Sequence, residues 1–177
     1  VGDDACRLIA DCLSGVSGAG RSLREELLFG EVAEGVRAYG VTTHRHRPEI
    51  EMALDHLSRS ITTVTFTPHL VPIQRGLLAT VTARLNSPVR NPGEVLRGFY
   101  EKSRFVEVID GPPQTRWVVG SNRALVAAFV DERQGVVIAQ CAIDNLLKGA
   151  AGQAVQAANI MCGFDEGRGL PRAGFMP

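Results

Sequence analysis

Two apolar runs in the second half of the chain restrict its fold more than any other feature. Residues 124–130 and 136–143 are rich in alanine and β-branched side chains and are separated by the polar segment DERQG, which predicts a β-hairpin. Residues 77–85 alternate between apolar and polar side chains, as a strand with one buried face does. The chain must therefore build a sheet, and we expect its helices to cover one face of that sheet.

The rest of the sequence predicts strands and helices without a regular alternation. Further strands are expected at residues 7–13, 62–67, 105–109 and 116–119, and helices at residues 48–58, 94–102 and 148–162. Pro68 and Pro72 are expected to interrupt regular structure after residue 67. This order predicts an α+β fold with one large mixed or mostly antiparallel sheet rather than repeated βαβ units.

Apolar spacing also predicts which side of two helices is buried. In residues 48–58 the apolar stripe consists of Ile50, Ala53, Leu54 and Leu57. In residues 94–102 the side chains expected to face inward are Val95, Leu96 and Phe99. Each helix is therefore expected to pack on the sheet through these residues.

Length and charge exclude several classes of protein. A chain of 177 residues fits one domain with a substantial core, so residues 1–177 are expected to form a single unit. The 19 basic and 19 acidic side chains cancel, which gives no electrostatic reason to expect binding to nucleic acid or to an anionic membrane. No apolar run approaches the roughly 18 residues that span a bilayer. The chain begins at Val1 without a signal peptide, so we expect a fragment or an excised domain.

The cysteines do not suggest a metal site. Cys6, Cys12, Cys141 and Cys162 form no CxxC pair, and their spacing is too wide for a zinc site. We therefore expect no bound metal and four buried, reduced thiols.

The tripeptide His44-Arg45-His46 is the first candidate for chemistry. Imidazole has the unperturbed pKa nearest neutral pH, which suits proton transfer, and the guanidinium fork of arginine suits carboxylate or phosphate. In an extended segment His44 and His46 would share one side and Arg45 the other. Glu49 would orient one imidazole or favour the start of the next helix. The alternative is two surface histidines before a helix.

The segment Ser14-Gly15-Val16-Ser17-Gly18-Ala19-Gly20-Arg21 is the second candidate. Its glycines let backbone N–H groups approach a ligand, and such concave backbone segments favour anions. It has neither the spacing of a Walker loop nor that of a Rossmann fingerprint. The alternative is a flexible turn, because a glycine-rich segment is expected to be irregular.

Two further segments contain unusual residues. Residues 67–76 hold two prolines and end in Arg75-Gly76, which is either an anion contact or a rigid connection with an exposed arginine. Residues 144–156 open a helix with Asn145, Gly149 and Gly152 in its first turns. Glycine costs helix stability there, so something must approach closely, either another part of the backbone or a cofactor.

Four segments in this order resemble N-acetyl-γ-glutamyl-phosphate reductases. They are SGVSGAGR (14–21), AYGVTTHRHRPEI (38–50), VTFTPHLVPIQRGLLATV (64–81) and AIDNLLKGAAGQAVQAANIMCGFDEGRGL (142–170). The resemblance implies an NADPH-dependent enzyme that reduces an acyl phosphate to an aldehyde through a cysteine thioester and releases phosphate. It also implies a domain like the C-terminal domain of glyceraldehyde-3-phosphate dehydrogenase, a cytoplasmic location and a homo-oligomer formed through the sheet.

The resemblance assigns roles to named residues. It implies that His46, with His44 as the second choice, is the catalytic acid/base. The residues implied at the substrate are Arg45, Arg21, Ser14, Gly15, Ser17, Gly18, Arg75 and Glu49. Those implied at the cofactor are Asn145, Gly149 and Gly152.

Two parts of the family pattern are missing from this sequence. The nucleophilic cysteine of the family lies in a Gly-Cys-Tyr-like motif, which neither Cys6 nor Cys12 matches. The Rossmann fingerprint is also absent, and Leu13 stands where a polar residue is expected. The chain therefore resembles the C-terminal part of the enzyme and should be inactive alone. NADP would be bound mainly by an absent N-terminal Rossmann domain, against which the helix near residues 145–162 would pack.

Three other functions remain open. Two stay within the same chemistry: an aminoadipyl-phosphate reductase of lysine synthesis and a relative of aspartate-semialdehyde dehydrogenase. One additional methylene in a substrate changes binding by only roughly 1–3 kcal/mol, so sequence separates these weakly. The third is a non-catalytic oligomerisation module, because the predicted strands have enough apolar surface for both a core and a partner.

Overall fold

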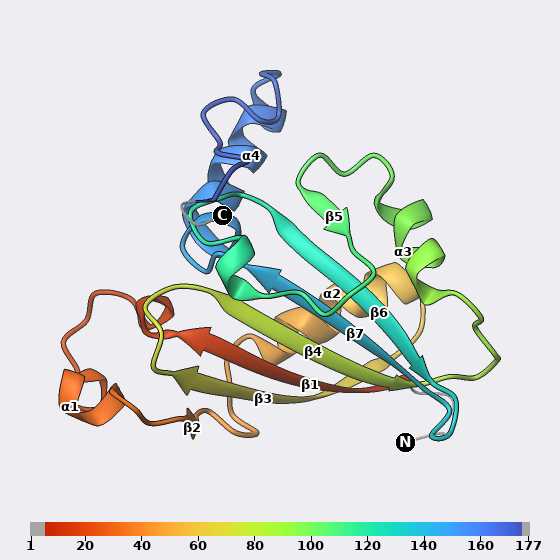
Figure 1. Ribbon diagram of the computed structural model, residues 1–177, viewed down its shortest axis with the longest axis horizontal. Coiled ribbons are helices and arrows are strands. Elements are labelled where there is room, and N and C mark those ends of the chain that lie inside the picture. The colour runs from red at the N-terminus through yellow and green to blue at the C-terminus, as the bar shows by residue number, and fades with distance from the viewer. Residues whose placement is uncertain (1–5, 175–177) are drawn as a thin grey trace.

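A seven-stranded mixed sheet forms the body of the molecule (Figure 1). The computed structural model describes residues 6–174. The strands are β1 (Cys6–Gly15), β2 (Arg37–Ala38), β3 (Thr62–Val71), β4 (Leu77–Arg84), β5 (Val106–Val108), β6 (Ala124–Asp131) and β7 (Val136–Ile143), in the spatial order β2-β3-β1-β4-β7-β6-β5. The helices are α1 (Phe29–Val32), α2 (Arg47–Ser58), α3 (Pro92–Tyr100) and α4 (Gly152–Met161). None of the helices in this part of the chain has the length and hydropathy that crossing a bilayer requires.

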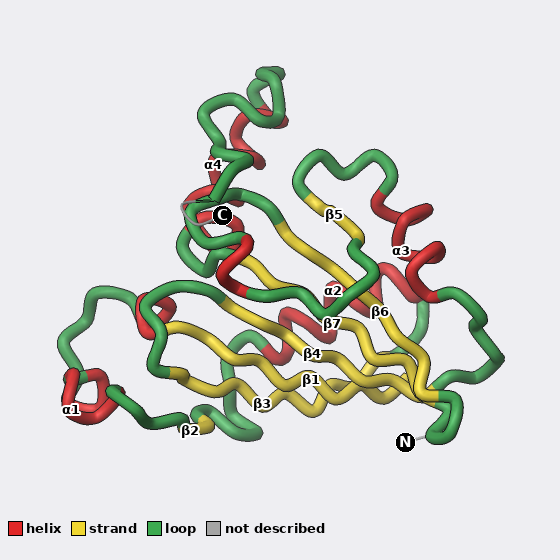
Figure 2. Tube along the Cα trace, viewed as in Figure 1, coloured by secondary structure: helices red, strands yellow, loops and turns green. Residues whose placement is uncertain are grey.

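The predicted hairpin is confirmed as β6 and β7. These strands pair in antiparallel register from Ala124 opposite Ile143 to Asp131 opposite Val136. β4 pairs with β7 and with β1, again antiparallel, whereas β1 and β3 run parallel. The sheet is therefore mixed, as predicted, with the hairpin and β4 forming its antiparallel centre. Figure 2 shows that the connection from β1 to α2 is mostly loop.

The two faces of the sheet differ in how well they are covered. On one face, a cross-strand row pairs Leu13 with Leu78, Leu78 with Ala142, and Ala142 with Leu125. Leu125 and Ala142 belong to the buried core with Val118, but Leu13 at the other end of the row is 39% exposed. Ile9 lies four residues before Leu13 in β1, on the same face of the sheet, and is 51% exposed. This face, which we call the open face, is therefore only partly covered, and its apolar residues Ile9 and Leu13 flank a polar position, Asp11 opposite Thr80.

Helix α2 packs against β3 through charged side chains rather than through the predicted apolar stripe. Glu51 and Asp55, one turn apart, accept hydrogen bonds from the backbone N–H groups of Val64 and Thr62. β2 pairs only with the far end of β3, so these amides have no strand partner, and the carboxylates satisfy them. Ile50 and Leu54 are half-buried, but the prediction was wrong for Ala53 and Leu57, which are exposed.

Helix α3 begins two residues earlier than predicted. The Asn91 side chain accepts a hydrogen bond from the Glu94 N–H at 3.2 Å and caps the helix. Leu96 and Tyr100 are half-buried, whereas Val95 and Phe99 are exposed. The inward orientation predicted for Val95 and Phe99 was therefore wrong, because positions 96 and 100, one turn apart, face the sheet.

Proline 68 does not end its strand. The backbone N–H groups of Thr62 and Val64 point away from β1 towards α2, and Pro68 occupies a position of the same parity in β3. Its missing N–H therefore removes no bond to β1, and the strand continues to Val71.

The strand predicted at residues 116–119 was also wrong, since Thr115–Trp117 form a 3₁₀ turn.

Candidate functional site

Asn145 joins the glycine-rich segment to the start of β4. Its Oδ1 accepts a hydrogen bond from the Gly76 N–H at 2.9 Å, and its Nδ2 donates to Ser17 Oγ at 3.0 Å. β1 runs on to Gly15, and Val16–Ala19 form a 3₁₀ turn, so the predicted irregular loop is regular structure. A Cβ on Gly15 would lie 2.9 Å from the carbonyl oxygen of Ile73. The glycine is therefore needed for close packing between these two segments.

Asp144 is a buried carboxylate that holds Arg75. Its side chain is fully buried and accepts hydrogen bonds from the N–H groups of Gly120 at 2.7 Å, Leu146 at 2.8 Å and Leu147 at 2.9 Å. The Arg75 guanidinium lies 2.8 Å away. Burial raises the pKa of Asp144, but these hydrogen bonds outweigh it and leave the pKa below its ordinary value of 3.8. Asp144 is thus ionised at neutral pH and fixes the position of Arg75.

The two histidines form a separate cluster with aromatic side chains. The ring of His44 lies 4.9 Å from that of His46, 5.6 Å from Tyr39 and 5.1 Å from Phe66, measured between centroids. The segment is not extended, because a turn is closed here by the hydrogen bond from Arg47 N–H to the His44 carbonyl oxygen at 3.1 Å. The turn nevertheless brings the two rings together.

The surroundings of His44 keep its ring neutral and oriented. Its Nδ1 accepts a hydrogen bond from the backbone N–H of His46 at 3.3 Å, so the neutral ring carries its proton on Nε2. Burial, followed by the positive charges of His46 and Arg45, lowers the pKa of His44 below 6.5. A neutral imidazole with its proton on Nε2 can donate a hydrogen bond from that atom to an oxygen on which negative charge develops.

The other predicted site residues fall into two groups. Ser14, Gly15, Ser17, Gly18 and Arg75 lie in the cluster around Asn145 and Asp144. The remaining three are Arg21, Arg45 and Glu49, whose side chains are exposed. Within residues 6–174, no hydrogen bond joins these side chains to either cluster. The structure thus brings the glycine-rich segment, Arg75 and Asn145 together, and no hydrogen bond described within residues 6–174 joins this cluster to the histidines.

The three residues expected at a cofactor make contacts within the chain instead. Both ends of the Asn145 amide bond to the protein, as described above. A Cβ on Gly152 would collide with Asn122 Oδ1 and with the Leu147 carbonyl, and one on Gly149 would lie 3.3 Å from Ile143. These contacts correspond to the close approach of backbone that the glycines indicated. The role of these residues towards a dinucleotide stays a prediction.

Two of the four cysteines, Cys12 and Cys141, are poorly suited to act as nucleophiles. Burial raises the pKa of Cys12 and of Cys141 to about 11, with neighbouring Asp11 adding to the effect on Cys12. Both thiols are therefore protonated at neutral pH. Cys6 and Cys162 are exposed, so the expectation that all four are buried was wrong. All four are free thiols, as expected.

Sequence reasoning missed a polar network beneath α4. Gln156 Oε1 accepts hydrogen bonds from Asn122 Nδ2 at 3.0 Å and from Lys148 Nζ at 2.7 Å. Asn159, one turn further along α4, donates to the backbone carbonyls of residues 166 and 168. The inner side of α4 is therefore polar, and its outer side carries exposed Val155, Ile160 and Met161. The spacing of Gly152, Gln156 and Asn159 on one helix face was the available signal.

Comparison with known proteins agrees with this fold. The family described as "Semialdehyde dehydrogenase, dimerisation domain" matches residues 2–145. Curated proteins named N-acetyl-gamma-glutamyl-phosphate reductase are 48% identical over 180 residues in Moorella thermoacetica and 46% identical over 178 residues in Pelotomaculum thermopropionicum. Each match covers 98% of this chain and 51% of the relative, so the chain spans about half the length of these relatives.

Solved structures show the same architecture at low sequence identity. Aspartate semialdehyde dehydrogenase II from Vibrio cholerae has a TM-score of 0.67 and 19% identity, over 88% of this chain and 54% of that one. A probable aspartate-semialdehyde dehydrogenase from Pseudomonas aeruginosa has a TM-score of 0.69 and 17% identity, over 90% and 55%. The expected fold class, including the likeness to this group of dehydrogenases, is confirmed. The chain belongs to the semialdehyde dehydrogenase family, whose dimerisation domain it contains.

Proposed function

We propose that this chain is the C-terminal part of an NADPH-dependent N-acetyl-γ-glutamyl-phosphate reductase of arginine biosynthesis. The full protein would convert N-acetyl-glutamyl 5-phosphate to N-acetyl-glutamate 5-semialdehyde and phosphate in the cytoplasm. The observation that carries this proposal is the 46–48% identity, over nearly the whole chain, to curated relatives of that name. The nucleophilic cysteine and the main NADP site would lie outside these residues. The solved structure of aspartate semialdehyde dehydrogenase from Candida albicans contains NADP.

Acid/base chemistry in this proposal belongs to the pair His44 and His46. The family resemblance gives His46 as the first choice for the catalytic histidine, but the contacts in the structure favour His44. Its lowered pKa and its occupied Nδ1 leave a neutral ring whose Nε2–H can donate a hydrogen bond to the substrate oxygen as negative charge develops there. His46 is exposed beside it, with the two ring centroids 4.9 Å apart. NADPH would supply the hydride in this reaction, and the histidine pair of this chain would stabilise the oxygen on which negative charge forms.

Anion contact in this proposal belongs to the cluster around Arg75. Asp144 holds Arg75 from the buried side, and 27% of the arginine side chain remains exposed. The glycine-rich segment, tied to the same place by Asn145, brings backbone groups near this guanidinium. A carboxylate or phosphate of the substrate would bind here through charge-assisted hydrogen bonds. Arg21 and Arg45 are exposed and would contribute only in the complete enzyme.

The open face of the sheet would form a homodimer interface. The matched family is described as a dimerisation domain, and Ile9 and Leu13 leave apolar side chains exposed on this face. Such exposed apolar surface next to a core is typical of a subunit interface. The outer side of α4, with Val155, Ile160 and Met161, would pack on the Rossmann domain of the same protein.

Assays of the full-length protein with three acyl phosphates test this proposal. NADPH oxidation should be fastest with N-acetyl-γ-glutamyl phosphate and slower with aminoadipyl and aspartyl phosphates. A preference for aminoadipyl or aspartyl phosphate would assign the protein to one of the related enzymes instead. The absence of turnover with all three would leave only the oligomerisation role.

A further inference from the structure

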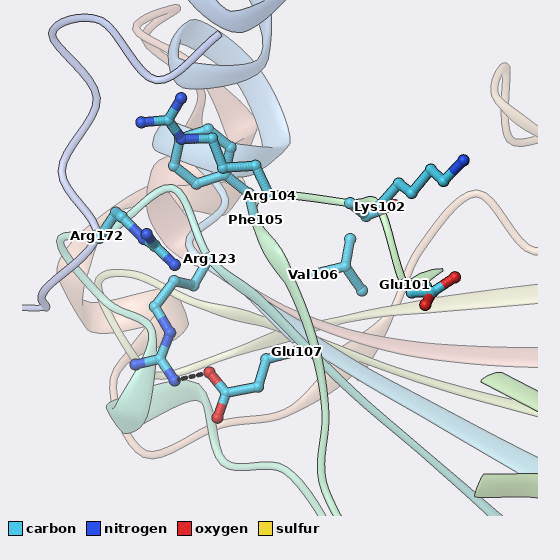
Figure 3. Close-up of a pocket in the computed structure, with 9 residues that line it drawn as sticks. Glu101, Lys102, Arg104, Phe105, Val106, Glu107, Arg123 and Arg172 are labelled. Carbon is cyan, nitrogen blue, oxygen red and sulfur yellow. Dashed lines mark hydrogen bonds and ion pairs between the residues drawn. The ribbon is translucent and has the colours of Figure 1, made fainter. Parts of the chain in front are cut away.

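A basic hollow lies beside β5, at the start of β6 and under the C-terminal segment (Figure 3). Its volume is about 330 Å³, which is in the range of small-molecule sites. Four cationic side chains line it, and the lining includes only two carboxylates, those of Glu101 and Glu107. The cations are Lys102, Arg104, Arg123 and Arg172. The chain as a whole has no net charge, so this local excess of positive charge is not a consequence of composition.

Three of these cations are arginines on the same side of the hollow. In Figure 3 the side chains of Arg104, Arg172 and Arg123 follow one another along that side, whereas Lys102 extends in the other direction. Arg104 pairs with Asp165 at 2.6 Å, and Arg123 pairs with Glu107. Within residues 6–174, Arg172 has neither a hydrogen bond nor an ion pair. An arginine left with its full set of donors beside two others favours an oxyanion ligand.

An apolar hollow adjoins the basic one across the Arg123–Glu107 ion pair. Both of these side chains line both hollows, and the second has a volume of about 560 Å³. Trp117, which is 41% exposed, Ile109 and Leu125 supply its apolar surface. A ligand with an anionic end and an apolar body would therefore reach arginines at one end and an aromatic ring at the other.

We propose that these adjoining hollows bind a small organic anion, with its phosphate or carboxylate held by Arg104, Arg123 and Arg172 and its apolar part against Trp117. The planar guanidinium group of arginine can donate paired hydrogen bonds to two oxygens of either a phosphate or a carboxylate. This site uses none of the residues assigned above to proton transfer or to substrate anion contact. It is therefore independent of the proposed reductase activity.

Binding of three probes to the 177-residue chain tests the site. Inorganic phosphate and succinate probe the basic hollow, and phenyl phosphate probes both hollows. Calorimetry should give saturable binding of phosphate or succinate, and whichever binds more tightly identifies the anionic group. Phenyl phosphate should bind more tightly than inorganic phosphate and should change the fluorescence of Trp117, the single tryptophan of the chain. Equal affinity for these two, or an unchanged fluorescence, would overturn the apolar part of the proposal.

Charge-matched variants separate the site from a general effect of charge. Arg172→Ala should weaken binding about tenfold, because one charge-assisted hydrogen-bonding partner is lost. Arg123→Lys keeps the charge but loses the fork and should also weaken binding. Arg133→Ala, in the exposed turn of the β6–β7 hairpin, removes the same charge elsewhere and should bind as the wild type does. No saturable binding of any probe, or equal affinity of Arg172→Ala and Arg133→Ala, would overturn the site.

Discussion

The buried carboxylate of Asp144 holds the guanidinium of Arg75 at 2.8 Å. The same carboxylate accepts the N–H groups of Gly120 and of its near neighbours Leu146 and Leu147, so it joins the segments around residues 75, 120 and 144–147. Because these bonds satisfy a buried charge, losing the charge should disturb all three segments together.

Asp144→Asn should lower the free energy of unfolding by about 1–3 kcal/mol, because weaker neutral hydrogen bonds replace charge-assisted ones. Chemical denaturation measures this difference. Asp131→Asn is the matched control, since Asp131 accepts one turn hydrogen bond from Gln134 at the surface. The control should change stability by less than about 0.5 kcal/mol. Equal losses in the two variants would contradict the role given to Asp144.

The stability of the wild type should depend on pH through Asp144. Its folded-state pKa lies below the ordinary value of 3.8, so its contribution is complete above that value and is lost as pH falls through the lower folded-state pKa. Below pH about 4 the wild type should therefore lose stability more steeply than Asp144→Asn. Denaturation midpoints measured from pH 6 to pH 2.5 check this, and parallel curves would exclude Asp144 as a source of the acid sensitivity.

Asn145→Asp should loosen the glycine-rich segment while leaving β4 in place. The aspartate keeps the acceptor for the Gly76 N–H but loses the donor to Ser17 Oγ. Hydrogen exchange followed by mass spectrometry should show faster exchange in residues 15–20 and unchanged exchange in residues 77–84. Asn145→Ala should raise exchange at Gly76 as well. Unaltered exchange of residues 15–20 in both variants would show that Asn145 does not hold this segment.

Reactivity should separate the four thiols into two pairs. Cys12 and Cys141, with pKa values raised to about 11 by burial, should resist iodoacetamide at pH 7.5, whereas exposed Cys6 and Cys162 should react. Peptide mass spectrometry of the native chain counts the modified sites. Full modification after unfolding is the control, and rapid alkylation of Cys12 in the native state would contradict its burial.

Ile9→Asp should convert a homodimer to a monomer. Ile9 lies on the open face, so a buried unpaired carboxylate would oppose association there. Analytical ultracentrifugation should give twice the 19.0 kDa chain mass for the wild type and one chain mass for the variant. Val95→Asp places the same charge on exposed α3 and should remain dimeric. A monomeric wild type at high concentration would remove the sheet interface from the account.

The sequence predicted best what depends on neighbouring residues. The β6–β7 hairpin needs only its two runs and its turn, and both were visible. The predicted buried side of α2 was wrong in part because Glu51 and Asp55 face β3 and accept hydrogen bonds from its backbone amides. The apolar periodicity of a helix carries no information about such contacts. The contacts of the site are also non-local: Asn145 meets Ser17 across 128 residues and Gly76 across 69. Residue types indicated these as site residues, but only the folded sheet shows which of them meet.

The pH profile of the full-length enzyme should reflect His44. Burial lowers the pKa of His44, and the charges of His46 and Arg45 lower it further. A reaction that needs the neutral ring should therefore lose kcat/KM only as pH falls below 6.5. Arg45→Ala removes one positive neighbour, so it should move this loss to higher pH. Arg59→Ala, at the other end of α2, should leave the profile unchanged. An acid limb that does not move in Arg45→Ala would exclude His44 as the titrating group.

The turnover of N-acetyl-γ-glutamyl phosphate by histidine variants of the full-length protein tests the central claim most directly. His44→Asn should lower kcat about 10²–10³-fold, the usual contribution of one hydrogen-bond donor to a developing oxyanion. His56→Asn, exposed on α2, should retain wild-type turnover, and the isolated 177 residues should show none. Wild-type turnover by the double variant His44→Asn, His46→Asn, or NADPH-dependent reduction by the isolated chain, would contradict the account.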